Sequence, residues 1–215
     1  MLGEGTAVIR TTGQQFQRSG FVVTDALLTR DDLQQLSAHL PAVSSSGTRT
    51  LLNDAVFRGL AQRLRADPAL VAFLSGLVAV EGILFWKSRD RNWSLKPHRD
   101  SVIPISGDGP WKPAGRKEGM AFAHAPIAFL RRCIAVRLAL DAVPEGDIRV
   151  EPGTHDSCER ASPKTLVVPP GGVAVLRPSL VHSSTKLTDS PRRRVVHLLY
   201  APRTLPGNYL WYHAV

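Results

Sequence analysis

The chain has 215 residues, of which 43% are hydrophobic and 21% charged, as in ordinary globular proteins. This length suits one substantial core, so we expect residues 1–215 to form a single domain. No apolar run approaches the length of about 18 residues that a membrane-spanning helix needs, and residues 1–16 lack the layout of a signal peptide. With only Cys133 and Cys158, no disulfide framework is expected, and we predict a cytoplasmic protein with reduced thiols.

The net charge of +9 raises nucleic acid as a partner. The basic residues are scattered along the chain, apart from the run RRR at 192–194. We find no zinc-finger spacing, no aromatic RNA-binding motif and no evident helix-turn-helix. We therefore expect a small-molecule substrate, and a basic surface would favour an anionic one. We expect neither nucleic acid nor a membrane as partner.

The first part of the chain predicts helices. TRDDLQQLSAHL (29–40) has leucines at helical spacing, Thr29 as a plausible N-cap and acidic residues in its first turn. LLNDAVFRGLAQRL (51–64) predicts the next amphipathic helix, and Pro68 marks the start of a third. The apolar stripes of these helices indicate core packing.

After residue 80 the pattern changes to short β-branched or alternating runs separated by Gly and Pro. We predict strands over 81–87, 133–143, 147–152, 165–170, 172–178 and 193–202. Several short strands with turns between them indicate an antiparallel sandwich or barrel, with the N-terminal helices on one outer face. The stretch 104–126, rich in Gly and Pro, predicts a long loop, and we expect it to close over a ligand as a lid.

Three residues form a candidate metal site. In a β-strand His98 and Asp100 would point to the same side, because side chains alternate. His182 ends an apolar run, at the mouth of the expected barrel. Two histidines and one carboxylate, with other coordination positions open, form the facial triad of non-haem Fe(II) oxygenases. Zinc accepts the same ligands, so the ligand types alone leave the metal open.

A basic residue follows this triad on the next predicted strand. Arg193 offers a rigid fork for a carboxylate, as a 2-oxo acid bound to iron would need. Ser184 could add a hydroxyl to the same carboxylate. Strand alternation predicts that Arg193 and His197 share one face, whereas Arg192 is expected to be a solvated residue of the turn.

Taken together, the segments FWKSRDRNWSLKPHRD, RVEPGTH, GGVAVLRPSLVHSSTK and RRRVVHLLYAP resemble the phytanoyl-CoA dioxygenase-like family of Fe(II)/2-oxoglutarate oxygenases. The match covers most of residues 20–211, in the family's order. It implies an α+β, mainly β fold, a double-stranded β-helix (jelly-roll, cupin-like), with Fe(II), 2-oxoglutarate and O2 as cofactors. It also implies that the iron ligands are His98, Asp100 and His182. The residues that it implies for the cosubstrate pocket are Arg193, Ser184 and Trp111.

The sequence departs from the family at several positions. Arg99 stands between the ligands, where Gln is common, and Glu145 and Thr154 replace an Asn and a Ser. Arg99 would alternate away from the ligands on a strand, so it puts the surroundings of the site in doubt more than metal binding. Asp100 is retained, whereas related halogenases have a small residue there. We therefore predict hydroxylation of an unactivated C–H bond rather than halogenation.

Three further residues are candidates for lining the substrate pocket: Lys87, Trp93 and Arg137. For Lys87 and Arg137 the alternative is a salt bridge at a strand end, and for Trp93 it is simple packing. Desaturation, ring formation and epimerisation stay open as reaction outcomes. The alternative function is a catalytically inactive metal-binding relative that serves as a sensor or scaffold.

Overall fold

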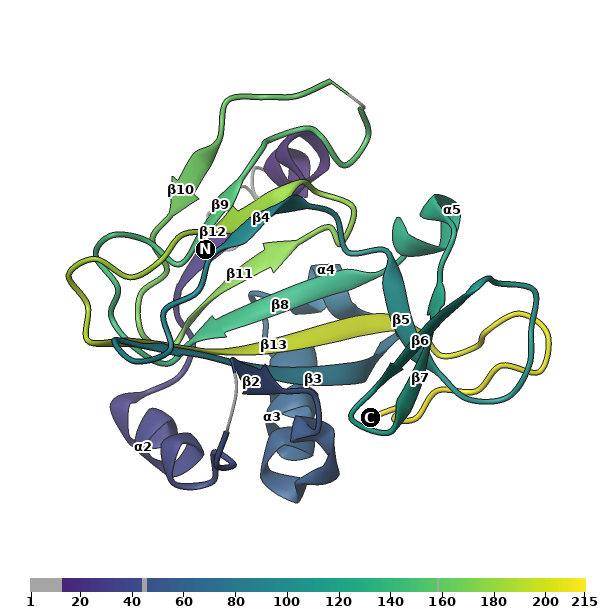
Figure 1. Ribbon diagram of the computed structural model, residues 1–215, viewed down its shortest axis with the longest axis horizontal. Helices are drawn as coiled ribbons and strands as arrows, with labels where there is room; N and C mark the ends of the chain where they lie inside the picture. Colours follow the sequence, from purple (N-terminus) through teal and green to yellow (C-terminus); the bar gives the residue numbers. More distant parts are fainter. Residues whose placement is uncertain (1–12, 44–45, 158) are drawn as a thin grey trace, which may run out of the picture.

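Two antiparallel sheets, made mostly by the second half of the chain, organise the molecule (Figure 1). The computed structural model describes residues 13–43, 46–157 and 159–215. In spatial order the major sheet holds β1 (Phe21–Ala26), β11 (Gly172–Leu176), β8 (Ile134–Ala139), β13 (Arg192–Pro202), β3 (Leu77–Ser88) and β2 (Gly47–Thr48). The minor sheet holds β10 (Lys164–Leu166), β9 (Ile148–Val150), β12 (His182–Ser184) and β4 (Leu95–His98).

The chain passes repeatedly from one sheet to the other. From β8 it crosses to β9 and β10, returns to β11, crosses to β12 and returns to β13. This alternation is that of a double-stranded β-helix, so the predicted mainly β jelly-roll is confirmed. The crossing leaves a space between the sheets, into which the inner faces of both project.

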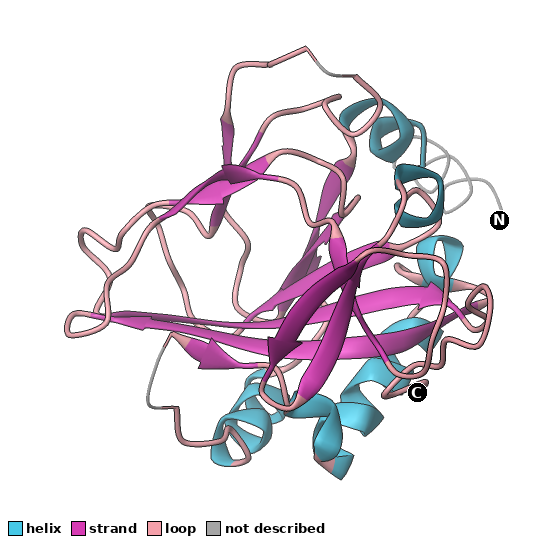
Figure 2. Cartoon of the chain, turned by 45° about the vertical axis from the view of Figure 1, so that its right-hand side comes forward, coloured by secondary structure: helices cyan, strands magenta, loops and turns pink. Residues whose placement is uncertain are grey.

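Helices cover the outer face of the major sheet (Figure 2). They are α2 (Arg30–Ala38), η1 (Leu51–Asn53), α3 (Ala55–Ala66) and α4 (Val71–Leu74). Val196, Leu198 and Tyr200 alternate along β13 and pack in the same core cluster as these helices. The hydroxyl of Tyr200 donates to the carbonyl of Ala61, at 2.8 Å, and so joins β13 to α3. The residues between them on β13 face the other way, toward the minor sheet.

The expected helix starts are partly confirmed. The side chain of Thr29 accepts a hydrogen bond from the backbone N–H of Asp32, and the carboxylate of Asp32 accepts one from the backbone N–H of Thr29, which completes a capping box at the start of α2. Within 51–64 the side chain of Asp54 accepts from the backbone of Val56, so the segment is divided into η1 and α3. The helix expected after Pro68 is only the four residues of α4. A helix over 13–19 and strand β1 were not predicted.

The prediction of a long loop over 104–126 is wrong. This region forms a third sheet from β5 (Val102–Ile105), β7 (Met120–His124) and β6 (Pro113–Lys117). Glu118 and Gly119 join β6 to β7 with φ of 48° and 82°, as a two-residue hairpin turn requires. The carboxylate of Glu118 accepts hydrogen bonds from the Thr48 hydroxyl and from the Arg49 backbone. A closing motion of this hairpin stays a prediction.

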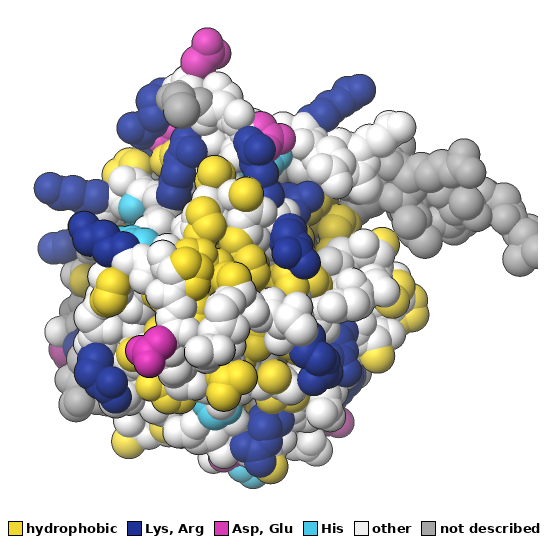
Figure 3. All heavy atoms as spheres, turned by 90° about the vertical axis from the view of Figure 1, so that its right-hand side faces the viewer, with side chains coloured by type: hydrophobic (Ala, Val, Ile, Leu, Met, Phe, Trp, Pro, Cys, Tyr) yellow, Lys and Arg dark blue, Asp and Glu magenta, His cyan; other side chains and the backbone are white. Residues whose placement is uncertain are grey.

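The surface charges, the helix lengths and the cysteines say little about function. Lys and Arg side chains are spread over the face drawn in Figure 3, around an apolar centre. Within the described ranges, no helix has the length and apolar character needed to cross a bilayer. Cys133 is a buried free thiol, and burial raises its pKa to about 12. Cys158 and most of the segment tested for a signal peptide lie outside the described residues.

Candidate metal centre and adjoining cavity

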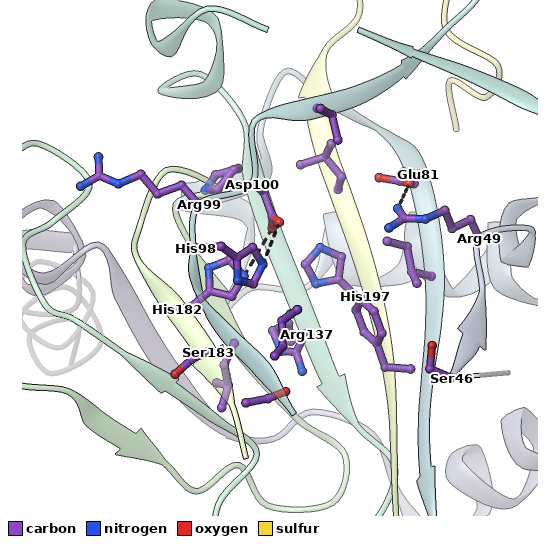
Figure 4. A pocket seen from close by; sticks show the side chains of 18 of the residues that line it. Ser46, Arg49, Glu81, His98, Arg99, Asp100, Arg137, His182, Ser183 and His197 are labelled. Carbon is purple, nitrogen blue, oxygen red and sulfur yellow. Dashed lines mark hydrogen bonds and ion pairs between the residues drawn. The ribbon is translucent and has the colours of Figure 1, made fainter. Parts of the chain in front are cut away.

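His98 and His182 lie directly opposite each other on β4 and β12. Strand β4 ends at His98, and the backbone N–H of Asp100 donates to the carbonyl of Pro178 instead, at 3.0 Å. The carboxylate of Asp100 lies 3.6 Å from Nε2 of His98 and 3.7 Å from Nε2 of His182. The three candidate ligand atoms lie within 4.8 Å of one another, so one metal ion could contact all three (Figure 4).

The backbone prepares both imidazoles for a metal. Nδ1 of His98 lies 2.9 Å from the carbonyl oxygen of Lys96, and Nδ1 of His182 lies 2.9 Å from that of Leu180. Because a carbonyl oxygen only accepts, Nδ1 carries the proton of the neutral ring and Nε2 keeps its lone pair. Such second contacts of ligand histidines set the tautomer and the ring orientation. Both free nitrogens face Asp100.

The electrostatics of the group favour a carboxylate that stays ionised. Burial alone would raise the pKa of Asp100, but His182, His98 and His197 together hold it well below its usual range. Burial lowers the pKa of His182, which favours the neutral imidazole that a metal needs. The hydrogen bond to Asp100 raises the pKa of His98. One anionic oxygen ligand and two nitrogen ligands remain, as a facial triad requires.

A cavity of about 490 Å³ opens beside the triad, and one end of it is strongly basic. Lys87, Arg137 and Arg193 line this end and are almost completely buried; we call them the cationic cluster. Asp147 lies between the two arginines, with its carboxylate 3.4 Å from Nε of Arg137 and 3.5 Å from Nε of Arg193. Three cations facing one carboxylate leave a formal excess of two positive charges, so an additional anion would relieve their repulsion.

Lys87 is held by polar and aromatic groups. Its Nζ donates to the Ser184 hydroxyl at 3.0 Å and to the carbonyl of Thr185 at 2.6 Å. The same atom lies 4.2 Å from the ring centre of Trp93. Burial, together with the charges of the two arginines, lowers the pKa of Lys87 to about 7. Lys87 is therefore close to losing its charge near neutral pH unless an anion binds beside it.

The structure gathers all but one of the predicted site residues around this cavity. Those that line it are His98, Asp100, His182, Ser184, Arg193, Lys87, Trp93 and Arg137. The expectation that Trp111 reaches the cosubstrate pocket is not met. Its ring packs 4.9 Å from that of Phe129 and 5.4 Å from that of Tyr209, outside the cavity lining. The hairpin that follows Trp111 carries it toward the C-terminal segment instead.

Several residues at the cavity were not predicted to take part in it. Asp147 binds both arginines, and the sequence offered only an acidic residue at a strand start as a signal. His197 lines the cavity, as strand alternation indicated, although no role followed from that. Glu81 is buried in the apolar run of β3, and a lone carboxylate in such a run is the signal that could have marked it.

Comparisons with known proteins agree with this arrangement at the level of the fold. No model of a known protein family matches the chain, and no curated protein sequence matches it. SnoN, a non-haem α-ketoglutarate-dependent epimerase from nogalamycin biosynthesis, superposes with a TM-score of 0.70 at 16% identity, over 93% of this chain and 82% of SnoN. HygX from Streptomyces hygroscopicus, with nickel and 2-oxoglutarate bound, gives 0.65 at 15% identity, over 92% and 88%.

AviO1 from Streptomyces viridochromogenes Tue57 gives a TM-score of 0.64 at 20% identity, over 92% of this chain and 96% of AviO1. Identities this low establish likeness of fold and nothing finer. The chain therefore has the fold of non-haem 2-oxoglutarate-dependent enzymes, with a His–Asp–His group of its own that could hold a metal.

Proposed function

We propose that this protein is an Fe(II)- and 2-oxoglutarate-dependent dioxygenase of the phytanoyl-CoA dioxygenase-like type, which hydroxylates an unactivated C–H bond of a small molecule. The observation that carries the proposal is that the facial triad and the cationic cluster open on the same cavity. The triad would hold iron, and the cationic cluster would hold the far carboxylate of the cosubstrate. In such a site iron supplies the oxidative decarboxylation of 2-oxoglutarate and the oxidation of the substrate C–H bond.

The donor set fits both groups. Neutral imidazole and carboxylate suit Fe(II), and three protein ligands leave positions open for a chelating cosubstrate. Arg193 presents its guanidinium to the cavity while Asp147 and the carbonyl of Gly146, at 3.2 Å from Nη1, hold it in place. Because the guanidinium is oriented before any ligand arrives, little side-chain entropy remains to be lost on binding. Lys87 and Ser184 lie close enough to share the same carboxylate.

Lys87 and Arg137 therefore belong, in this proposal, with the cosubstrate rather than with the substrate. Arg137 also forms the salt bridge that was the alternative for it. The ring of Trp93 packs against Lys87 and lines the cavity, so packing and lining coincide in that residue.

The fold leaves the fate of the substrate open, since SnoN is an epimerase and SnoK a carbocyclase. We favour hydroxylation because Asp100 occupies the place that halogenases keep free for a halide. A natural-product substrate is supported by neighbours that act in nogalamycin biosynthesis and by a HygX structure that holds hygromycin B. An epimerisation would leave the product without new oxygen, which separates it from hydroxylation.

Anaerobic addition of Fe(II) and then 2-oxoglutarate tests the proposal directly. We expect the weak visible charge-transfer band of a chelated 2-oxo acid, and on admission of oxygen we expect succinate. Under ¹⁸O₂, hydroxylation places one labelled oxygen in succinate and one in the product. A protein that binds iron but gives neither the band nor succinate would contradict the proposal and favour a sensor or scaffold.

A further inference from the structure

A buried histidine in the cavity has no protein partner for one of its ring nitrogens. His197 is 7% exposed, and its Nδ1 is buried without a hydrogen-bond partner in the described part of the chain. Its ring is held edge-on to Phe85, with ring centres 5.8 Å apart, and points into the cavity (Figure 4). Burial lowers the pKa of His197 to about 3, so the ring is neutral. A buried polar atom without a partner is costly and indicates a missing ligand or water.

An ion pair to which the proposed function gives no role, Arg49–Glu81, lies beyond His197 as seen from the triad (Figure 4). Arg49 Nη1 lies 2.5 Å from Oε1 of Glu81, which is 5% exposed. The guanidinium of Arg49 lies over the ring of Phe122, at 5.5 Å. Glu81 lies on the inner face of β3, opposite Leu199 of β13. His197 precedes Leu199 by two residues on the same strand. Arg49, Glu81 and His197 thus line one side of the cavity, and we call these three residues the polar wall.

Glu81 and Lys87 mark opposite ends of the inner face of β3, and His197 lies between them, opposite Arg137 on β8. Glu81 and Lys87 are both on the inner face of β3, and six residues of a strand span about 20 Å. In Figure 4, His197 lies between the triad and the Arg49–Glu81 pair. Since the cosubstrate is assigned to the cationic end, the Arg49–Glu81 pair borders the space left for the substrate, and His197 lies between the two.

We propose that the polar wall binds a neutral, hydroxylated part of the substrate, which deepens the proposed function and rests on it. Arg49 and Glu81 together carry no net formal charge. A carboxylate or phosphate would be repelled by Glu81, and an amine would be repelled by Arg49. A hydroxyl donates and accepts at once, so a pair of neighbouring hydroxyls matches the carboxylate oxygen, the guanidinium N–H groups and the imidazole of His197.

This inference revises the expectation of an anionic substrate. That expectation depended on the basic surface of the chain. Arg99 lines the cavity, and its Nη2 donates to the carbonyl of Ser157 at 3.0 Å. Figure 4 shows the Arg99 side chain directed away from the triad. Lys117 also lines the cavity, and its Nζ lies 5.6 Å from the ring centre of Phe122, the ring over which Arg49 lies. The three residues of the polar wall are neutral as a set.

The test compares three six-membered-ring probes that differ only in their polar groups. They are trans-cyclohexane-1,2-diol, cyclohexanecarboxylate and cyclohexylamine. Each is titrated into protein loaded with Zn(II) and 2-oxoglutarate, because this complex is diamagnetic and does not turn over. Saturation-transfer NMR measures binding of each probe. We expect the diol to bind at least about tenfold more tightly than either charged probe, because each of those leaves a like charge buried.

Variants then locate the binding. Glu81→Gln replaces an ionised acceptor by a weaker neutral one, and His197→Phe removes the imidazole; each should weaken the diol by about five- to tenfold. His197→Phe keeps the aromatic packing on Phe85. Ser46→Ala, which removes a hydroxyl from the same cavity outside the polar wall, serves as the control and should change nothing. Tighter binding of the carboxylate or the amine, or a diol affinity indifferent to both substitutions, would overturn the inference.

The charge-transfer band separates this test from the proposed function. Wild-type protein and Glu81→Gln should show the band with Fe(II) and 2-oxoglutarate, because Glu81 lies at the other end of β3 from Lys87. A band in the absence of selective diol binding would overturn the substrate inference alone. Absence of the band in the wild type would contradict the oxygenase function itself.

Discussion

Replacing Arg193 by Leu should raise the 2-oxoglutarate concentration needed for half-maximal turnover by about 100-fold. Arg193 is 5% exposed, and its Nε lies 3.5 Å from the carboxylate of Asp147. Removing one partner of a buried ion pair costs about 3–5 kcal/mol. Because Lys87 and Arg137 stay beside the site, we take the lower end, about 3 kcal/mol. At about 1.4 kcal/mol per tenfold change this corresponds to roughly 100-fold.

Succinate formation as a function of 2-oxoglutarate concentration measures this effect, and anaerobic titration of the charge-transfer band measures binding alone. Arg193→Lys should give a smaller increase, since an ammonium keeps the charge but not the fork. Arg192→Ala is the matched control: its side chain is 54% exposed and pairs with Asp141 at the surface, so near wild-type behaviour is expected. An unchanged requirement in Arg193→Leu, or a large change in Arg192→Ala, would refute the reasoning.

Asp100→Ala should abolish metal-dependent succinate formation, because it removes one of the three candidate metal ligands; full turnover would show that Asp100 is not a ligand. At pH 8, above the pKa of about 7 of Lys87, binding of 2-oxoglutarate should take up a proton, because an anion beside the amine raises that pKa. Calorimetry in buffers of different ionisation enthalpy measures this uptake, which should vanish near pH 5 and in Lys87→Met. Trp111→Ala should lower the free energy of unfolding by about 2 kcal/mol, less than for a fully buried aromatic residue, and leave cosubstrate affinity unchanged. Denaturant unfolding measures the first effect, and weakened 2-oxoglutarate binding would place Trp111 at the cavity after all.

Local periodicity was enough to predict much of this protein. Strand alternation correctly placed Arg193 and His197 on the cavity face of β13, and Arg194 is on the other face, paired with Asp141. Thr29 was recognisable as a helix cap because its partner is three residues away. Such features depend on near neighbours in the chain, so the residue types themselves determine them. The His–Asp–His group was also found from residue types and the order of the strands that carry them.

The tertiary structure alone decided which side chains from distant segments of the chain meet. Asp147 meets Arg193 only because β13 lies beside β8 and the turn before β9 comes back to them, and Arg49 meets Glu81 only because β2 pairs with β3. Trp111 left the expected pocket for the same reason, since the third sheet packs it against the C-terminal segment. Contacts of this kind depend on sheet register and on packing across long stretches of chain. No local pattern encodes them, and they determine which charges at the cavity are neutralised and which are left for ligands.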